Sequence, residues 1–201
     1  MEPQALEAIS HIIRNRRSIK PVDMDPARTV ERALLMTLFE NANWAPTHGL
    51  TEPWRFTVFQ GDGRGELSET MQRIYRETTP AAGFREDKMK KMSVNPLLAS
   101  AVLVIWMERR GGAKIPELEE IEATACAVMN LSLSACAAGL AGYWSTPPLI
   151  HTREFATWLG IREEDRCLGL FYLGWPKPGF TQPTGVRHPV AEKITWRGEP
   201  S

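Results

Sequence analysis

Residues 123–140 read ATACAVMNLSLSACAAGL and are apolar or small almost all the way round a helix. They form the C-terminal part of a long helix predicted from Pro116 to Ala138. Gly139 suits its end, because glycine readily adopts the left-handed conformation that closes many helices. A helix without a polar face must be covered on every side. In a chain of 201 residues, that requires structural layers above and below the helix, or a partner subunit.

The remaining chain mixes helices and strands without strict alternation. Apolar residues at helical spacing predict helices over residues 5–13, 25–44, 66–78 and 152–159. Apolar runs bounded by turn residues predict strands over residues 54–60, 101–107, 142–146 and 166–173. The helix at residue 25 is expected because Asp25 suits its N-cap and Pro26 its first turn. This mixture favours an α+β fold over a doubly wound sheet, in one domain spanning residues 1–201.

Two segments are less regular. Residues 81–94 are polar and rich in lysine, which is typical of a solvated helix or a mobile loop. A substrate lid is the alternative, because lids are drawn from weakly packed stretches. The tail from residue 178 to residue 201 is rich in proline and glycine. It is expected to run extended over the surface or onto a neighbouring subunit.

Composition restricts the class of protein. The 24 Lys and Arg residues balance 24 Asp and Glu residues, so no domain-wide positive field attracts nucleic acid. No apolar run approaches the length of a membrane span, and no signal peptide is apparent, so a cytoplasmic protein is expected. The three cysteines, Cys126, Cys136 and Cys167, are predicted to be buried core residues, with a reactive thiol as the alternative. The four histidines and these cysteines show no metal-ligand spacing, so no metal site is predicted.

A basic segment, RNRRSIK at residues 14–20, follows the first helix. Arginine presents a planar fork of donors that fits phosphate oxygens, and serine adds a neutral donor. With no net positive charge on the chain, a small-molecule phosphate is a better ligand than nucleic acid. The alternative is a solvated basic turn that caps the C-terminus of the helix.

Four segments, taken in order, resemble the FMN-dependent nitroreductase family, and most closely its short, minimal members. They are residues 16–20 (RRSIK), residues 44–56 (WAPTHGLTEPWRF), residues 139–146 (GLAGYWST) and residues 173–189, which contain GWP and RHP. The resemblance implies a three-layer α+β fold with a mixed, mainly antiparallel central sheet flanked by helices. It also implies a homodimer, with the long helix at its core and FMN bound at the interface.

The first segment is the family's main cofactor contact. The resemblance places Arg16 and Ser18 at the phosphate side of FMN, with Arg17 beside them and Ile19 in the same binding segment. Lys20 would lie near N1 and O2 of the flavin ring. A cation at that position stabilises the anion formed when the ring accepts hydride.

The second segment contributes to the flavin that is bound mainly by the other subunit. In the family members that this chain resembles, a histidine at the place of His48 contacts that flavin, and Trp44 and Thr47 would lie near it. Many members carry Asn and Gln just before the Pro-Trp pair. This chain has Thr51 and Glu52 there, so side-chain contacts from this loop are expected to differ.

The last two segments complete the implied site. Trp144, Ser145 and Thr146 match positions along the flavin ring, with core packing of Trp144 as the alternative. Arg187 matches a tail arginine at the FMN phosphate. Many members have a lysine two residues earlier, where this chain has Gly185, so one phosphate contact is expected to be missing.

The resemblance implies an FMN-dependent NAD(P)H oxidoreductase with ping-pong kinetics. NADH or NADPH would reduce the flavin, and a nitroaromatic, a quinone or a similar small oxidant would take the electrons. No side chain need act as an acid, base or nucleophile, because the flavin carries the chemistry. The alternatives are a flavin-binding carrier or sensor without NAD(P)H turnover, and a specialised flavin enzyme of the same superfamily.

Overall fold

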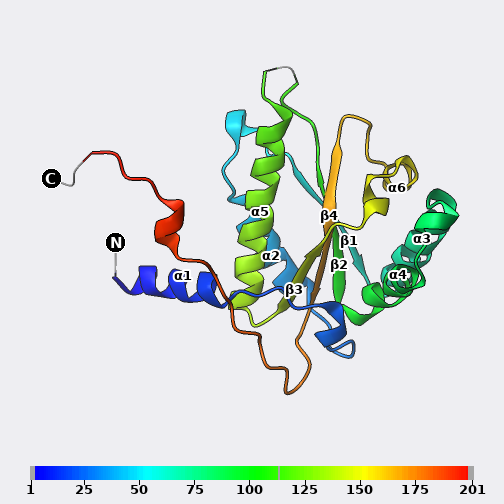
Figure 1. The fold of residues 1–201 in the computed structure, drawn as a ribbon, viewed down its shortest axis with the longest axis horizontal. Helices are drawn as coiled ribbons and strands as arrows, with labels where there is room; N and C mark the ends of the chain where they lie inside the picture. The colour runs from blue at the N-terminus through cyan, green and yellow to red at the C-terminus, as the bar shows by residue number, and fades with distance from the viewer. Residues whose placement is uncertain (1–2, 113, 199–201) are drawn as a thin grey trace.

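A four-stranded antiparallel sheet forms the centre of the computed structural model, which describes residues 3–112 and 114–198 (Figure 1). The strands are β1 (Trp54–Gln60), β2 (Ala101–Met107), β3 (Ala141–Ser145) and β4 (Arg166–Gly174). Their order is β1-β2-β4-β3, and each neighbouring pair is antiparallel. β2 and β4 are therefore central, and β2 is buried along nearly its whole length because helices cover both faces.

Helices form a layer on each face of the sheet. One layer contains α2 (Arg32–Asn43) and α5 (Glu117–Ala137). The other contains α3 (Gly63–Thr78), α4 (Glu86–Leu98) and α6 (Arg153–Leu159). Alternate residues of β2 serve the two layers: Leu103 packs with the α2–α5 layer, and Val102 and Val104 pack with the α3–α4 layer. The expected three-layer α+β fold is thus confirmed, and its one described parallel contact is an isolated bridge between Ser18 and Gly142.

Most predicted elements lie where the sequence placed them, but the helix expected at residue 25 is wrong. α2 begins at Arg32. The Asp25 carboxylate instead accepts a hydrogen bond from the Ala27 N–H (3.0 Å), which closes a local turn. Val30 is fully buried, and its N–H donates to Ser100 Oγ (2.6 Å) at the start of β2. This tertiary contact fixes the chain in a non-helical path until residue 32.

The lysine-rich segment is mostly helical. A short 3-10 turn, Ala81–Gly83, precedes α4. Met89 and Met92 of α4 are buried against the core, whereas most of its lysines are exposed. The Arg85 N–H donates to Tyr75 Oη (2.9 Å), which ties the start of α4 to α3. Of the interpretations weighed, a solvated helix fits this segment.

α5 is the long helix, and only part of its surface is covered within one chain. Ala127, Leu131 and Ala135 are buried against the sheet layer. Met129 is 49% exposed and Cys126 is also exposed, because both lie on the outward side. The prediction that all three cysteines are buried is therefore wrong for Cys126, and Cys136 is only partly buried. Cys167 is buried, as predicted, and this burial raises the pKa of its thiol to about 11.

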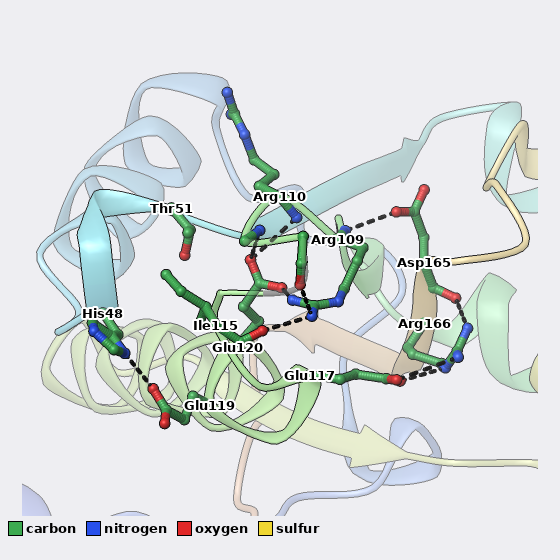
Figure 2. A network of polar contacts seen from close by, with 12 residues as sticks. His48, Thr51, Arg109, Arg110, Ile115, Glu117, Glu119, Glu120, Asp165 and Arg166 are labelled. Atoms are coloured by element: carbon green, nitrogen blue, oxygen red, sulfur yellow. Dashed lines mark hydrogen bonds and ion pairs between the residues drawn. The ribbon is translucent and has the colours of Figure 1, made fainter.

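Both ends of α5 are firmly fixed. At the C-terminus, Gly139 has a φ of 75°, and the Leu140 N–H donates to the Ala135 carbonyl (2.9 Å), as expected for a glycine-closed helix. At the N-terminus, Glu120 is 1% exposed and forms an ion pair with Arg109. Its carboxylate also accepts the Gly111 N–H (2.9 Å), so the preceding loop is anchored to the first turn (Figure 2).

A second buried carboxylate, Asp165, anchors the same loop from the start of β4. It is 5% exposed and accepts hydrogen bonds from the Arg109 N–H (2.8 Å) and the Arg162 guanidinium (2.8 Å). Burial alone would raise the pKa of this carboxyl. The hydrogen bonds from Arg162 and from backbone N–H groups outweigh burial and hold the pKa below its ordinary value.

We expect Asp165→Asn to lower the free energy of unfolding by about 1–3 kcal/mol at neutral pH, because buried donors lose a charged acceptor. The lowered pKa means that the carboxylate stabilises the fold above its unfolded-state pKa. That stability is lost as the pH falls through the folded-state pKa. Urea unfolding at neutral pH and below pH 4 measures the effect, and the two chains should converge in acid. Glu164→Gln, at an exposed neighbour, is the control, and a gap that persists in acid would contradict the assignment.

Candidate functional site

The basic segment at residues 16–20 crosses the open edge of β3. Ser18 bridges to Gly142, and the Ile19 N–H donates to the Gly142 carbonyl (2.9 Å). Arg16 lies on the α5 side of this edge, whereas Lys20 lies on the α4 side. The segment therefore offers cations to both sides of one strand edge.

On the α5 side, the segment borders a cavity of about 160 Å³ just beyond α1 (Pro3–Asn15), between the end of α5 and the C-terminal tail. Arg16, Ser132, Cys136 and Gln182 contribute to its wall. Within the described chain, the Arg16 guanidinium makes no hydrogen bond or ion pair with another side chain. Burial raises the pKa of the Cys136 thiol, although Arg16 and Arg17 oppose the shift. This cavity can hold a small anion beside a guanidinium whose donors are available.

Arg17 has a different role from its neighbour. Its Nε donates to the Pro183 carbonyl (3.0 Å), and its Nη1 donates to the carbonyls of Arg14 (2.6 Å) and Arg16 (2.8 Å). Gly185 packs directly on the guanidinium, so a Cβ at that position would overlap it. Arg17 therefore joins the C-terminus of α1 to the tail, and the glycine that replaces the family's lysine is required by this contact.

The tail arginine, Arg187, lies close in sequence to this contact. Arg187 follows Gly185 by two residues, which is at most about 7 Å of extended chain. Its side chain is exposed, and Nη1 donates to the adjacent Val186 carbonyl (2.7 Å). Arg16 and Arg17 thus lie at one end of α5, and Arg187 lies two residues beyond the Gly185 contact, outside the residues that line the cavity.

On the α4 side, two adjoining hollows of about 530 and 170 Å³ form what we call the α4 groove. They share Lys91, Asn95 and Tyr143, and Lys20 and Ser145 line its two parts. Lys91 and Asn95 were missed by sequence reasoning. The sequence predicts a solvated helix, a mobile loop or a substrate lid over residues 81–94, and nothing in the local pattern pairs that segment with residue 20.

The two residues beside Ser145 do not line the groove. Trp144 points to the opposite side of β3, where its Nε1 donates to the Leu168 carbonyl (3.0 Å) and its ring covers Gly169. Trp144 is 37% exposed, so it packs on the surface of the sheet and not in the core, which was the alternative for this residue. Thr146 follows β3 and is exposed.

The loop that carries His48 lies at the other end of α5. His48 Nδ1 is 2.6 Å from Glu119 Oε2, in the first turn of the helix (Figure 2). Thr47 Oγ1 accepts the Glu52 N–H (3.2 Å) and lies 3.1 Å from Thr51 Oγ1. The two residues that depart from the family pattern therefore close this loop. Trp44, at the end of α2, is 80% exposed.

The sequence-predicted residues consequently form two groups. Glu119 contacts His48, and Cys136 lies near Arg16. An α-helix rises about 1.5 Å per residue, so Glu119 and Cys136 lie about 25 Å apart along α5. Thr47 and His48 lie at the first end of α5, and Arg16 and Arg17 lie at the second. Within one chain, the two groups cannot contact the same ligand ring.

Two other kinds of feature are absent from residues 3–112 and 114–198. No three His, Cys, Asp or Glu side chains gather closely enough to suggest a metal site. No helix in the described ranges is long and apolar enough to cross a membrane.

The chain matches known proteins in both sequence and fold. The family model described as "Nitroreductase family" matches residues 13–175. The chain is 29% identical over 172 residues to "Putative NAD(P)H nitroreductase YdjA" of Escherichia coli K12, covering 86% of this chain and 90% of that protein. The crystal structure of a nitroreductase-like family protein from Bacillus cereus matches with a TM-score of 0.76 and 27% identity, over 93% of this chain and 94% of that one.

A more distant structure shares the fold. The FMN-dependent nitroreductase NfnB from Mycobacterium smegmatis, in complex with NADPH, matches with a TM-score of 0.73 at 17% identity, over 96% of this chain and 99% of that one. The family match covers most of the present sequence. The chain therefore belongs to the nitroreductase family.

The contact between Arg17 and the tail can be tested by proteolysis. Gly185→Ala would push a methyl group into the guanidinium, and Arg17→Ala would remove three hydrogen bonds. We expect trypsin to cleave after Arg187 about tenfold faster in either variant, because cleavage follows the population of the opened tail. Thr184→Ala, at an exposed neighbour, is the control. Cleavage at the wild-type rate in both variants would show that the contact does not hold the tail.

Proposed function

We propose that the chain is an FMN-dependent NAD(P)H oxidoreductase that passes electrons to a small oxidant, such as a nitroaromatic or a quinone, by a ping-pong mechanism. Family membership supports this proposal. The observation that carries it is the pair of hollows on either side of the β3 edge, with Arg16 in one and Lys20 in the other. A ligand with a phosphate at one end and an electron-accepting ring at the other suits that arrangement.

The donor set matches the chemistry of FMN. Arg16 and Arg187 would bind the phosphate as charged donors, with the Ser18 hydroxyl beside them. Arg17 acts indirectly, by holding the tail that carries Arg187. Lys20 would place its ammonium near the N1–O2 edge of the ring. When bound, FMN supplies the hydride and electron transfer, and these residues supply position and charge.

We infer that the working enzyme is a homodimer, because the two groups of predicted residues lie at opposite ends of α5. Packing two α5 helices antiparallel about a two-fold axis would bring the partner subunit's His48 to the Arg16 end of this chain. The outward side of α5 supports the proposal, since Leu118 and Met129 are 63% and 49% exposed. An exposed apolar stripe of this kind is typical of a subunit interface.

The loop at residues 47–52 and the tail also support a dimer. Leu50 is 83% exposed, and its φ of 53° is unusual for a non-glycine residue. Glu52 has a φ of 43°. Strained backbone of this sort clusters at sites that bind a ligand or partner. In the tail, Trp196 is 85% exposed, as expected of a segment that runs onto a neighbour.

The proposed activity predicts a simple spectroscopic result. Protein loaded with FMN should be yellow and should bleach when NADH or NADPH is added without oxygen, because the bound ring accepts hydride. A nitroaromatic or a quinone should then restore the colour. The comparison of NADH with NADPH also identifies the preferred donor. A yellow protein that stays yellow with both donors would support the carrier or sensor, and failure to bind FMN would refute both functions.

The proposed dimer predicts that Met129→Glu separates the subunits, because two charges would meet near the two-fold axis. Sedimentation should give about twice the chain mass of 22.6 kDa for the wild type and the chain mass for the variant. FMN affinity should fall at least about tenfold, since each site loses the partner's loop. Leu97→Glu introduces the same charge at an exposed position of α4 and is the control. A wild-type monomer that still binds FMN tightly would contradict this architecture.

A further inference from the structure

The geometry points to Glu119 as a positioning residue for His48. The inference rests on the proposed function, in which His48 faces the flavin held by the partner subunit. His48 Nδ1 lies 2.6 Å from Glu119 Oε2 (Figure 2). An ionised carboxylate can only accept a hydrogen bond, so Nδ1 must carry the hydrogen. Nε2 is then the ring atom left to face the flavin.

The backbone that carries Glu119 is held rigidly by its neighbours. The next residue, Glu120, is 1% exposed, pairs with Arg109, and accepts the N–H groups of Arg110 (3.1 Å) and Gly111 (2.9 Å). These contacts fix the first turn of α5 against the preceding loop. Glu119 therefore projects from a backbone position that is held on its buried side.

The loop bearing His48 packs against the chain just before the same first turn of α5. A Cβ on Gly49 would lie 2.7 Å from Ile115 Cδ1, so the loop rests directly on a residue two positions before α5. Gly49, Leu50 and Glu52 all have positive φ, at 61°, 53° and 43°. Such a conformation persists only where its surroundings hold it. The backbone of His48 is thus placed by Ile115, and its ring is placed by Glu119.

This pair is poorly suited to a purely stabilising role. The side chains of His48 and Glu119 are 62% and 42% exposed, and exposed ion pairs contribute little to folding. The same exposure leaves Nε2 accessible to a second subunit and its ligand. Loss of Glu119 should therefore free the imidazole ring to rotate, without unfolding the loop.

The test compares Glu119→Ala, Glu119→Gln and His48→Ala in the FMN-loaded protein. Glutamine keeps an acceptor oxygen at nearly the same place and should preserve most of the function. Glu69→Ala removes an exposed carboxylate from α3, away from the outward side of α5, and is the control. Flavin reduction by the preferred nicotinamide donor is followed by stopped flow, the flavin midpoint potential is measured separately, and stability is measured by urea unfolding.

We expect Glu119→Ala and His48→Ala to slow flavin reduction about tenfold each. The first variant misplaces the imidazole ring and the second removes it, so both lose its contact with the flavin. The double variant should be no slower than either single one, since both remove the same interaction. The midpoint potential should shift equally in the two single variants, while the urea midpoint stays at the wild-type value. Nitrogen NMR of the His48 ring in the cofactor-free protein should show hydrogen on Nδ1 in the wild type and the glutamine variant, and a tautomer mixture in Glu119→Ala.

Two results would overturn the inference while leaving the proposed function intact. In the first, Glu119→Ala keeps the wild-type rate of flavin reduction and the wild-type midpoint potential, while flavin reduction in His48→Ala is slowed. The other is wild-type behaviour of His48→Ala itself, which would place the ring away from the flavin. A wild-type chain that binds FMN but is not reduced would refute the oxidoreductase. The potential and the NMR signals would still decide the role of Glu119 in that case, and failure to bind FMN would overturn both proposals.

Discussion

The packing of α5 is the constraint on which the rest of the structure depends. Ala127, Leu131 and Ala135 are small or apolar enough to lie close against the sheet layer. The helix cannot turn a polar side to water, because its opposite side is also largely apolar. One chain therefore leaves part of α5 exposed. The length of this helix also separates the two groups of predicted site residues. In the proposed dimer, one second subunit would cover this stripe and complete the site.

The edge of β3 is the second organising feature. An edge strand presents unpaired backbone groups, and here the basic segment covers part of that edge through Ser18 and Ile19. Crossing the edge distributes Arg16 and Lys20 to opposite sides. The tail is then held against Arg17 at the α1–α5 corner. A short run of sequence thus organises two hollows and the approach of the C-terminal tail.

Local chemistry explains which elements were predictable. Strands 54–60 and 101–107 match the observed strands at both ends, because apolar runs meet turn residues there. The Gly139 helix end was equally clear. Asp25-Pro26 misled because a carboxylate that can cap a helix can also close an isolated turn, and the buried Val30–Ser100 contact decided between them. Cys126 was misassigned because composition shows that a helix is apolar but not which side is covered.

The sequence by itself determined the α+β class, the identity of the basic segment and the family resemblance, since these depend on residue types and on spacing along the chain. The tertiary structure alone decided that Arg17 holds the tail at Gly185, that Lys91 shares a groove with Lys20, and that His48 meets Glu119. Each of these pairs is far apart in sequence. Their proximity arises from the layer packing and from the length of α5, and no local periodicity records it.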